Sequence, residues 1–345
     1  MAESIISRRG GSLGGTKIEI PSSADYVSIA FGLNIKKLDS SIEALSSMDY
    51  ETMVVKSDSS YIYVLAESYY HVLIIKLSAV DFSYIGYYAF GSAGWGSRNE
   101  VMIDNSLNFI YFTCKNSGVS VLNKTTLALV TTLPYAMNTS SCLTQDATSV
   151  YLGTGSALIK IVKTTWTATS TTTNGFRWLL FAHGKLYGAY VNDTANIRTY
   201  NTSTFGVTEV IASSIAQYNY VAETDLGIVM TALSIRHFNA TTKVTTAADY
   251  NITYNGLSYS NVWSSSLQYV SYSDGKIYTA NQNYFAIYST SDIAQPLFLT
   301  PIVLNNYVPL VDANHKFLLR TKSPYNNLYF EIFSLSENNG YAIKK

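Results

Sequence analysis

A short phrase that recurs at intervals of about forty residues constrains the fold of this chain more than any other feature. It consists of alternating apolar residues, one or two polar residues and then Ser or Thr. Its copies are LIIKLSA (73–79), SVLNKTT (120–126), IKIVKTT (159–165), RTYNTST (198–204), RHFNATT (236–242), AIYSTSD (286–292) and EIFSLSE (331–337). A repeat of this length indicates that copies of one supersecondary unit pack side by side.

Each copy of the phrase belongs to a unit of four short predicted strands. An apolar stretch, a turn rich in Asp, Asn or Gly, and a strand such as VYLGT (150–154) precede the phrase, and a weaker strand such as LALVTTL (127–133) follows it. Four antiparallel strands in about forty residues are typical of a β-propeller blade. The phrase itself is then the turn between the third and fourth strands, where Ser, Thr and Asn side chains bond to nearby backbone groups.

The number of units predicts an all-β propeller of seven four-stranded blades, with eight blades as the alternative. Seven complete units run from about residue 50 to residue 345. A partial unit precedes them, with YVSIAF (26–31) as its second strand and LNIKKLDSSIEAL (33–45) as its third and fourth. We expect residues 21–345 to form the propeller, with residues 21–49 as a partial blade that closes the ring.

The composition excludes several classes of partner. The 345 residues include 23 Lys plus Arg and 23 Asp plus Glu, so a net charge of zero gives no electrostatic reason to bind nucleic acid. No apolar run approaches the roughly 18 residues of a membrane span, which predicts no membrane insertion. The first residues lack the apolar core of a secretory signal, so we expect synthesis in the cytoplasm without a signal peptide.

The N-terminal stretch ESIISRRGGSLGG (3–15) resembles the start of tail-appendage proteins from phages of Gram-positive bacteria and from phage-tail-like bacteriocins. The resemblance implies a docking tail and glycine-rich joint over residues 1–20, multiple copies per particle and other tail proteins as partners. Ile5, Ile6, Arg8 and Arg9 would form the docking segment, and Gly10, Gly11, Gly14 and Gly15 the joint. The blades resemble only a generic β-propeller, because the Trp-Asp ending of WD repeats and the sialidase box are both absent.

The sequence predicts no catalytic residue, no metal site and no cofactor. Its four histidines show no metal-ligand spacing, and no nucleophile elbow, P-loop or dinucleotide fingerprint occurs. The pattern therefore favours a non-enzymatic protein. A polysaccharide-degrading propeller enzyme stays as an alternative, because paired carboxylates meet only in three dimensions.

Three longer intervals in the repeat place extra residues between the fourth strand of one blade and the first strand of the next. Such connectors all emerge on the same face of a propeller, and here they are rich in aromatic residues. The candidate ligand-binding residues are Tyr88, Trp95, Arg98, Tyr254, Tyr259, Trp263, Asn305 and Tyr307. Aromatic rings flanked by amide, hydroxyl and guanidinium groups suit a sugar or a protein partner, although the same rings also suit packing between blades.

These observations predict a virion or phage-tail-like particle component, which is extracellular after release. It would act as a tail-fibre or baseplate-associated receptor-binding protein that recognises a host cell-surface glycan or protein. The alternative from another class is a structural hub that contacts only other proteins of the particle.

Overall fold

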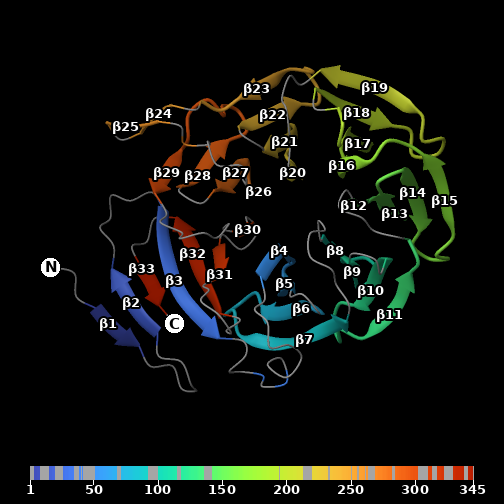
Figure 1. Ribbon diagram of the computed structural model, residues 1–345. Helices are drawn as coiled ribbons and strands as arrows, with labels where there is room; N and C mark the ends of the chain where they lie inside the picture. The colour runs from blue at the N-terminus through green and yellow to red at the C-terminus, as the bar shows by residue number, and fades with distance from the viewer. Residues whose placement is uncertain are drawn as a thin grey trace.

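The chain forms a ring of antiparallel sheets around a central axis (Figure 1). The computed structural model describes residues 4–7, 15–19, 26–34, 39, 41, 51–67, 71–91, 100–114, 118–135, 142–193, 195–212, 220–231, 234–249, 251–254, 256–260, 262, 269–281, 284–301, 310–312, 317–321, 329–337 and 341–344. Among these residues, none lies in a helix that is long and apolar enough to cross a membrane. The predicted all-β propeller architecture is confirmed.

Six blades are each built from four consecutive strands of one continuous stretch of chain. The first three comprise β4 (Glu51–Ser57), β5 (Tyr61–Glu67), β6 (His71–Ser78) and β7 (Tyr84–Gly91); β8 (Val101–Asp104), β9 (Phe109–Cys114), β10 (Gly118–Asn123) and β11 (Leu129–Leu133); and β12 (Cys142–Gln145), β13 (Ser149–Gly153), β14 (Ala157–Val162) and β15 (Ala168–Thr172). The next three comprise β16 (Phe176–Ala182), β17 (Lys185–Tyr190), β18 (Asn196–Tyr200) and β19 (Val207–Ala212); β20 (Tyr220–Glu223), β21 (Gly227–Thr231), β22 (Ile235–Asn239) and β23 (Thr245–Ala247); and β26 (Tyr269–Ser273), β27 (Lys276–Ala280), β28 (Tyr284–Ser289) and β29 (Phe298–Pro301).

The C-terminal unit supplies three strands of its sheet and the N-terminal segment supplies the fourth, whereas the sequence predicted seven complete units with the N-terminal segment attached as a partial blade. Its strands β30 (Leu310–Asp312), β31 (Phe317–Thr321) and β32 (Tyr329–Glu337) are joined by β3 (Tyr26–Asn34), in the order β3-β32-β31-β30. Residues 26–34 thus form one edge strand, whereas the sequence pattern suggested two strands that separate near residue 32. The pairing of Tyr26 with Glu337 and of Asn34 with Tyr329 brings the two ends of the chain together.

Two smaller sheets accompany the ring. The first joins β1 (Ser4–Ser7), β2 (Gly15–Glu19) and β33 (Tyr341–Lys344), beside β3 in Figure 1. The second is a hairpin of β24 (Ile252–Tyr254) and β25 (Leu257–Tyr259), inserted between β23 and β26.

Hydrophobic packing between neighbouring blades forms the core. The second and third strands of a blade are covered on both faces, so they read as apolar runs; β6 and β13 are buried almost throughout. The outermost strand β15 is mostly exposed and consists of Ala, Ser and Thr. One representative cluster joins Tyr63, Leu65 and Ile74 of one blade to Val101, Ile110 and Phe112 of the next.

The recurrent phrase forms the turn between the third and fourth strands, as predicted. In the turn at Asn123, its side-chain Oδ1 accepts hydrogen bonds from the backbone N–H groups of Thr125 and Thr126, both at 3.0 Å. Asn201 and Asn239 make the same pair of bonds in their own turns. The side chain replaces backbone partners that the ladder does not supply, which explains why Asn, Thr and Ser recur there.

Antiparallel strands assign the loops to two faces of the ring. Turns between first and second strands and between third and fourth strands lie on one face, which we call the turn face. The remaining loops, including the connectors between blades, lie on the other, which we call the connector face. The first strand of each blade is the innermost one (Figure 1). The turns between first and second strands, which we call the first turns, therefore surround the central axis.

Candidate functional site

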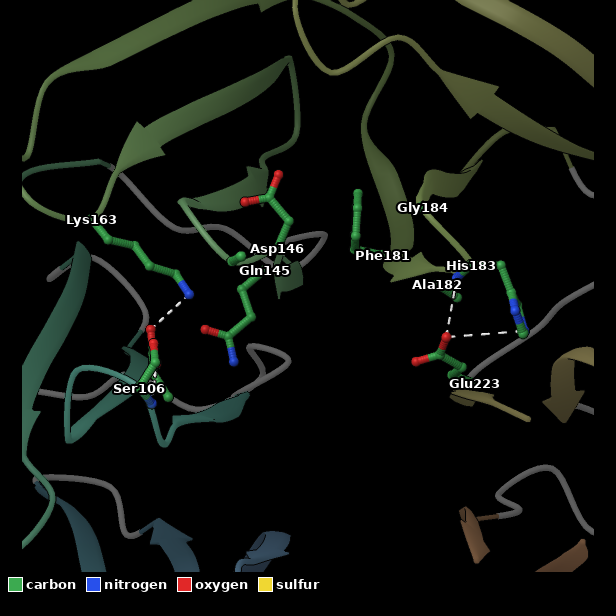
Figure 2. Close-up of a pocket in the computed structure, with 11 residues that line it drawn as sticks. Ser106, Gln145, Asp146, Lys163, Phe181, Ala182, His183, Gly184 and Glu223 are labelled. Carbon is green, nitrogen blue, oxygen red and sulfur yellow. Dashed lines mark hydrogen bonds and ion pairs between the residues drawn. The ribbon is translucent and has the colours of Figure 1, made fainter. Parts of the chain in front are cut away.

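A polar pocket of about 550 Å³ opens on the turn face, near the central axis. Its walls come from the first turns of four successive blades and include Asp104, Gln145, Asp146, His183 and Glu223. Figure 2 shows Lys163 and Gln145 on one side of the pocket and Phe181, His183 and Glu223 on the other. The volume lies within the range of small-molecule sites.

One wall is held by a buried ion pair. The Nζ atom of Lys163 lies 2.6 Å from Oδ2 of Asp104, and each side chain is only 3% exposed. Burial alone would raise the pKa of Asp104, but hydrogen bonds from Lys163, Ser106 and the Leu107 backbone outweigh it and hold the pKa below its usual range. Asp104 is therefore an anion at neutral pH, and its charge is matched by Lys163.

This ion pair repeats an arrangement found one blade earlier. There the Nζ atom of Lys124 lies 2.7 Å from Oδ2 of Asp58. Each lysine follows the first residue of a recurrent turn and reaches the first turn of the preceding blade. The pairs consequently tie successive blades together on the turn face.

The corresponding aspartate of the next blade has a different partner. This aspartate is Asp146, and the recurrent turn of the following blade has Thr202 in place of the lysine. Oδ2 of Asp146 accepts a hydrogen bond of 2.6 Å from the Tyr151 hydroxyl instead. Burial opposes ionisation of Asp146, yet the bonds from Tyr151, Thr148 and Ser149 lower its pKa. Among the ion pairs of the described residues, none includes Asp146, so its negative charge faces the pocket without a cation.

The opposite wall contains the tight turn His183-Gly184. Both residues have positive φ, 47° and 71°, as a two-residue hairpin turn of the primed type requires. Nε2 of His183 lies 2.8 Å from the carbonyl oxygen of Thr224, which can only accept, so Nε2 carries a proton. The His183 backbone N–H donates to Glu223 Oε1 at 3.0 Å and fixes that carboxylate at the rim.

The groups left over in the pocket are mainly acceptors. Gln145 donates from Nε2 to the carbonyl of Ile103 at 2.6 Å, and its buried Oε1 has no hydrogen-bond partner among the described residues. Phe181 adds an aromatic surface, because its ring stacks on Tyr151 at 6.1 Å with an interplanar angle of 6°. Among the described residues, no group of three or more His, Cys, Asp or Glu is placed to hold a metal. The arrangement suits reversible binding of a ligand that donates hydrogen bonds.

Three of the predicted ligand-binding residues lie within the described chain. Tyr88 lies in β7, and its ring packs edge-on against Phe112 of the next blade at 6.2 Å, so it contributes to the core. Tyr254 and Tyr259 share the hairpin β24–β25. Their rings contact Phe298 at 6.4 Å and Tyr284 at 6.0 Å, which holds the hairpin against the β26–β29 blade.

The structure brings Tyr254 and Tyr259 together but places Tyr88 in a blade elsewhere on the ring (Figure 1). Trp95, Arg98, Trp263, Asn305 and Tyr307 lie outside the described residues. Of the predicted docking segment, Ile5 and Ile6 lie in β1, while Arg8 and Arg9 lie outside the described residues.

Sequence reasoning missed the pocket residues, because each has an ordinary local explanation. Asp104 and Asp146 accept the backbone hydrogen bonds of their own turns, for which Asp is a common choice. One signal was available: the lysine of the phrase is present at 124 and 163 and absent at 202.

Comparison with known proteins supports the fold alone. No family model matches the chain, and no curated protein matches it in sequence. Among solved structures, the Pan2 WD40 domain of Neurospora crassa is similar with a TM-score of 0.65 at 7% identity, over 94% of this chain and 99% of that one. The RRP9 WD40 repeats give 0.62 at 13% identity, over 92% of this chain and 99% of that one, and a chain of a mitotic checkpoint complex gives 0.62 at 12%, over 97% and 98%. The chain shares the WD40-like propeller architecture without the Trp-Asp signature.

Proposed function

We propose that the protein is a non-enzymatic appendage of a virion or phage-tail-like particle, which binds a host cell-surface glycan or protein through one face of its propeller. The observation that carries this proposal is the N-terminal segment with Ile5, Ile6, Arg8 and Arg9, followed by glycines and by a rigid ring. Other tail proteins would hold that segment, and several copies per particle would raise the avidity of weak contacts.

The turn-face pocket supports a binding role. It combines an aromatic ring, Phe181, with the carboxylates of Asp146 and Glu223. A sugar presents C–H groups to such a ring and hydroxyl donors to such acceptors, and a basic side chain of a protein does the same with its methylenes and ammonium.

Attachment to host cells tests the proposal. We expect the purified full chain to sediment with host cells or to give signals on a glycan array, and Asp146→Asn with Glu223→Gln to weaken that binding. The matched control is Glu209→Gln, an acid in β19 that pairs with Lys243 at 3.0 Å away from the pocket. Absence of any binding to cells, glycans or surface proteins would contradict the proposal.

Docking to the particle is tested separately by deletion of residues 1–16. We expect the shortened chain to fold but to be lost from assembled particles. Unchanged incorporation would show that the N-terminal resemblance has no functional meaning here.

A structural hub is the second candidate, and exposed apolar residues on outer strands favour it. Val207 and Val210 of β19 are 47% and 56% exposed, and Leu129 and Val130 of β11 are 46% and 44% exposed. A hub would bind particle proteins while giving no signal on cells or glycans. Incubation with host-wall polysaccharide distinguishes the receptor-binding protein and the hub from an enzyme, because only an enzyme would generate new reducing ends.

We further propose that the sheet β3-β32-β31-β30 serves as the seventh blade of the ring. Contacts of β30 with both β26 and β4 support this, because those two strands begin the blades on either side.

A further inference from the structure

A second cavity, of about 460 Å³, lies between the β12–β15 blade and the β16–β19 blade. Thr171, Thr172 and Asn174 line one side, at the end of β15 and in the connector that follows it. Tyr190, Tyr200 and Phe205 line the other side. Tyr190 ends β17 toward the connector face and Phe205 lies in a turn on the turn face, so the cavity is a groove that runs across the rim of the ring.

The aromatic side of the groove is held in place by packing. Phe176 lies 5.2 Å from the ring of Tyr190 and 5.6 Å from that of Tyr200, measured between centroids. The guanidinium of Arg198 lies 4.5 Å above the Tyr190 ring and pairs with Asp193. These contacts pre-organise the aromatic wall, so a ligand would not need to order it.

The Tyr200 side chain backs this wall of the groove. Tyr200 is 3% exposed, and its hydroxyl oxygen is buried. Burial raises the pKa of Tyr200, and the neighbouring Tyr190 raises it further. The hydroxyl therefore stays protonated at neutral pH, and it belongs to the interior of the wall.

The opposite wall offers hydroxyl and amide groups. β15 is the edge strand of its sheet, and Thr172 and Asn174 are exposed. Among the described residues that line the groove, none is charged. A neutral ligand with many hydroxyls matches these walls, whereas a carboxylate would enter without a cation to pair with.

We propose that this groove binds a neutral pyranose sugar, whose C–H face packs on Phe205 and Tyr190 and whose hydroxyls bond Thr172 and Asn174 on the opposite side of the groove. The inference goes beyond the turn-face pocket, and it rests on the proposed function only in its choice of a glycan as the ligand. The groove would bind neutral host glycans in preference to acidic ones.

The positive φ of Phe205 is a property of its turn and not of the groove. Phe82, Leu127, Trp166 and Lys243 occupy the equivalent turn position with φ between 58° and 63°, so this conformation belongs to the turn. Because the turn is repeated, another blade offers a matched control for a substitution of Phe205. Phe82 lies in the equivalent turn between β6 and β7, in a blade that contributes no residue to the groove.

The test is a titration of the full chain with methyl glucoside, methyl galactoside and methyl N-acetylglucosaminide, followed by saturation-transfer NMR. We expect at least one neutral pyranoside to receive saturation, and the matched methyl glucuronide to bind at least tenfold more weakly. Phe205→Ala should lower the affinity about tenfold, while Phe82→Ala leaves it unchanged. Thr172→Glu should abolish binding, and Thr169→Glu, exposed on the same strand but outside the lining, should not.

Tyr200→Phe is a further control. The Tyr200 hydroxyl is buried behind the wall, so its removal should leave the sugar affinity unchanged. No transfer to any of the three neutral pyranosides, equal binding of the glucuronide, or full affinity in Phe205→Ala would each overturn the proposal. A chain that binds the glucoside but not cells would remove the proposed function and leave this inference standing, and the reverse result would remove the inference alone.

Discussion

Lys163 and Asp104 illustrate how single residues decide the stability of the turn face. Their ion pair is almost fully buried, so removal of one partner leaves an uncompensated charge in the interior. We expect Lys163→Met to lower the free energy of unfolding by about 3–5 kcal/mol, measured by urea denaturation.

The double variant Lys163→Met/Asp104→Asn should recover part of that loss, because the remaining charge is gone while Asn still accepts the bonds of the turn. Lys185→Met is the control, since Lys185 is 49% exposed and its pair with Glu209 is worth less than about 1 kcal/mol. Equal losses in Lys163→Met and Lys185→Met would show that the burial of the pair has no energetic consequence.

The same aspartates predict how stability depends on pH. The folded-state pKa values of Asp58 and Asp104 lie below those of the unfolded chain, so their contribution is complete above the unfolded value of about 3.9 and is lost as the pH falls through the folded values. His237 acts in the same direction from a higher pH. Burial lowers its pKa, so below about pH 6.5 the unfolded chain binds a proton that the folded chain does not.

We therefore expect the urea midpoint to fall from pH 7 to pH 5 through His237 and more steeply below about pH 4 through the aspartates. Asp104→Asn should flatten the lower part of the curve. A midpoint that stays constant from pH 7 to pH 5 would contradict the attribution to His237, and one that stays constant below about pH 4 would contradict the attribution to the aspartates.

At the scale of single elements, the hairpin turns give a clean test of backbone conformation. Gly275 has a φ of 74°, and an added Cβ would meet no atom within 4 Å. Gly275→Ala should cost about 1–2 kcal/mol of unfolding free energy from the backbone alone. Gly86→Ala, in a strand with equally open surroundings and no positive φ, should be neutral or stabilising. Similar losses at both sites would argue against this explanation.

The elements also show which features a sequence can reveal. The turn at Asn123 could be predicted because its hydrogen bonds join residues two and three positions apart. The pocket could not, because Asp146 and Glu223 belong to different blades and each also fits an ordinary turn. The ring of Tyr88 contacts Phe112 of the adjacent blade, and no local pattern encodes that contact.

At the scale of the whole molecule, the pairing of β3 with β32 joins the two ends of the chain and stabilises the ring. β3 supplies the outer strand of a sheet whose other strands lie near the C-terminus, so its loss would leave β32 with an unpaired edge. We expect deletion of residues 1–34 to lower the melting temperature strongly and to promote aggregation, whereas deletion of residues 1–25, which keeps β3, has a smaller effect. Equal melting temperatures for the two truncations would show that β3 does not close the ring.

The position of the chain ends determines which part of the ring lies farthest from the proposed docking segment. The strands β1, β2 and β33 lie together at one side of the ring, and β15 and β19 lie on the far side (Figure 1). If a particle holds the protein by its N-terminal end, as proposed, the rim that carries β15 and β19 points away from the particle, and the proposed sugar groove beside these strands is the part that meets the host surface first.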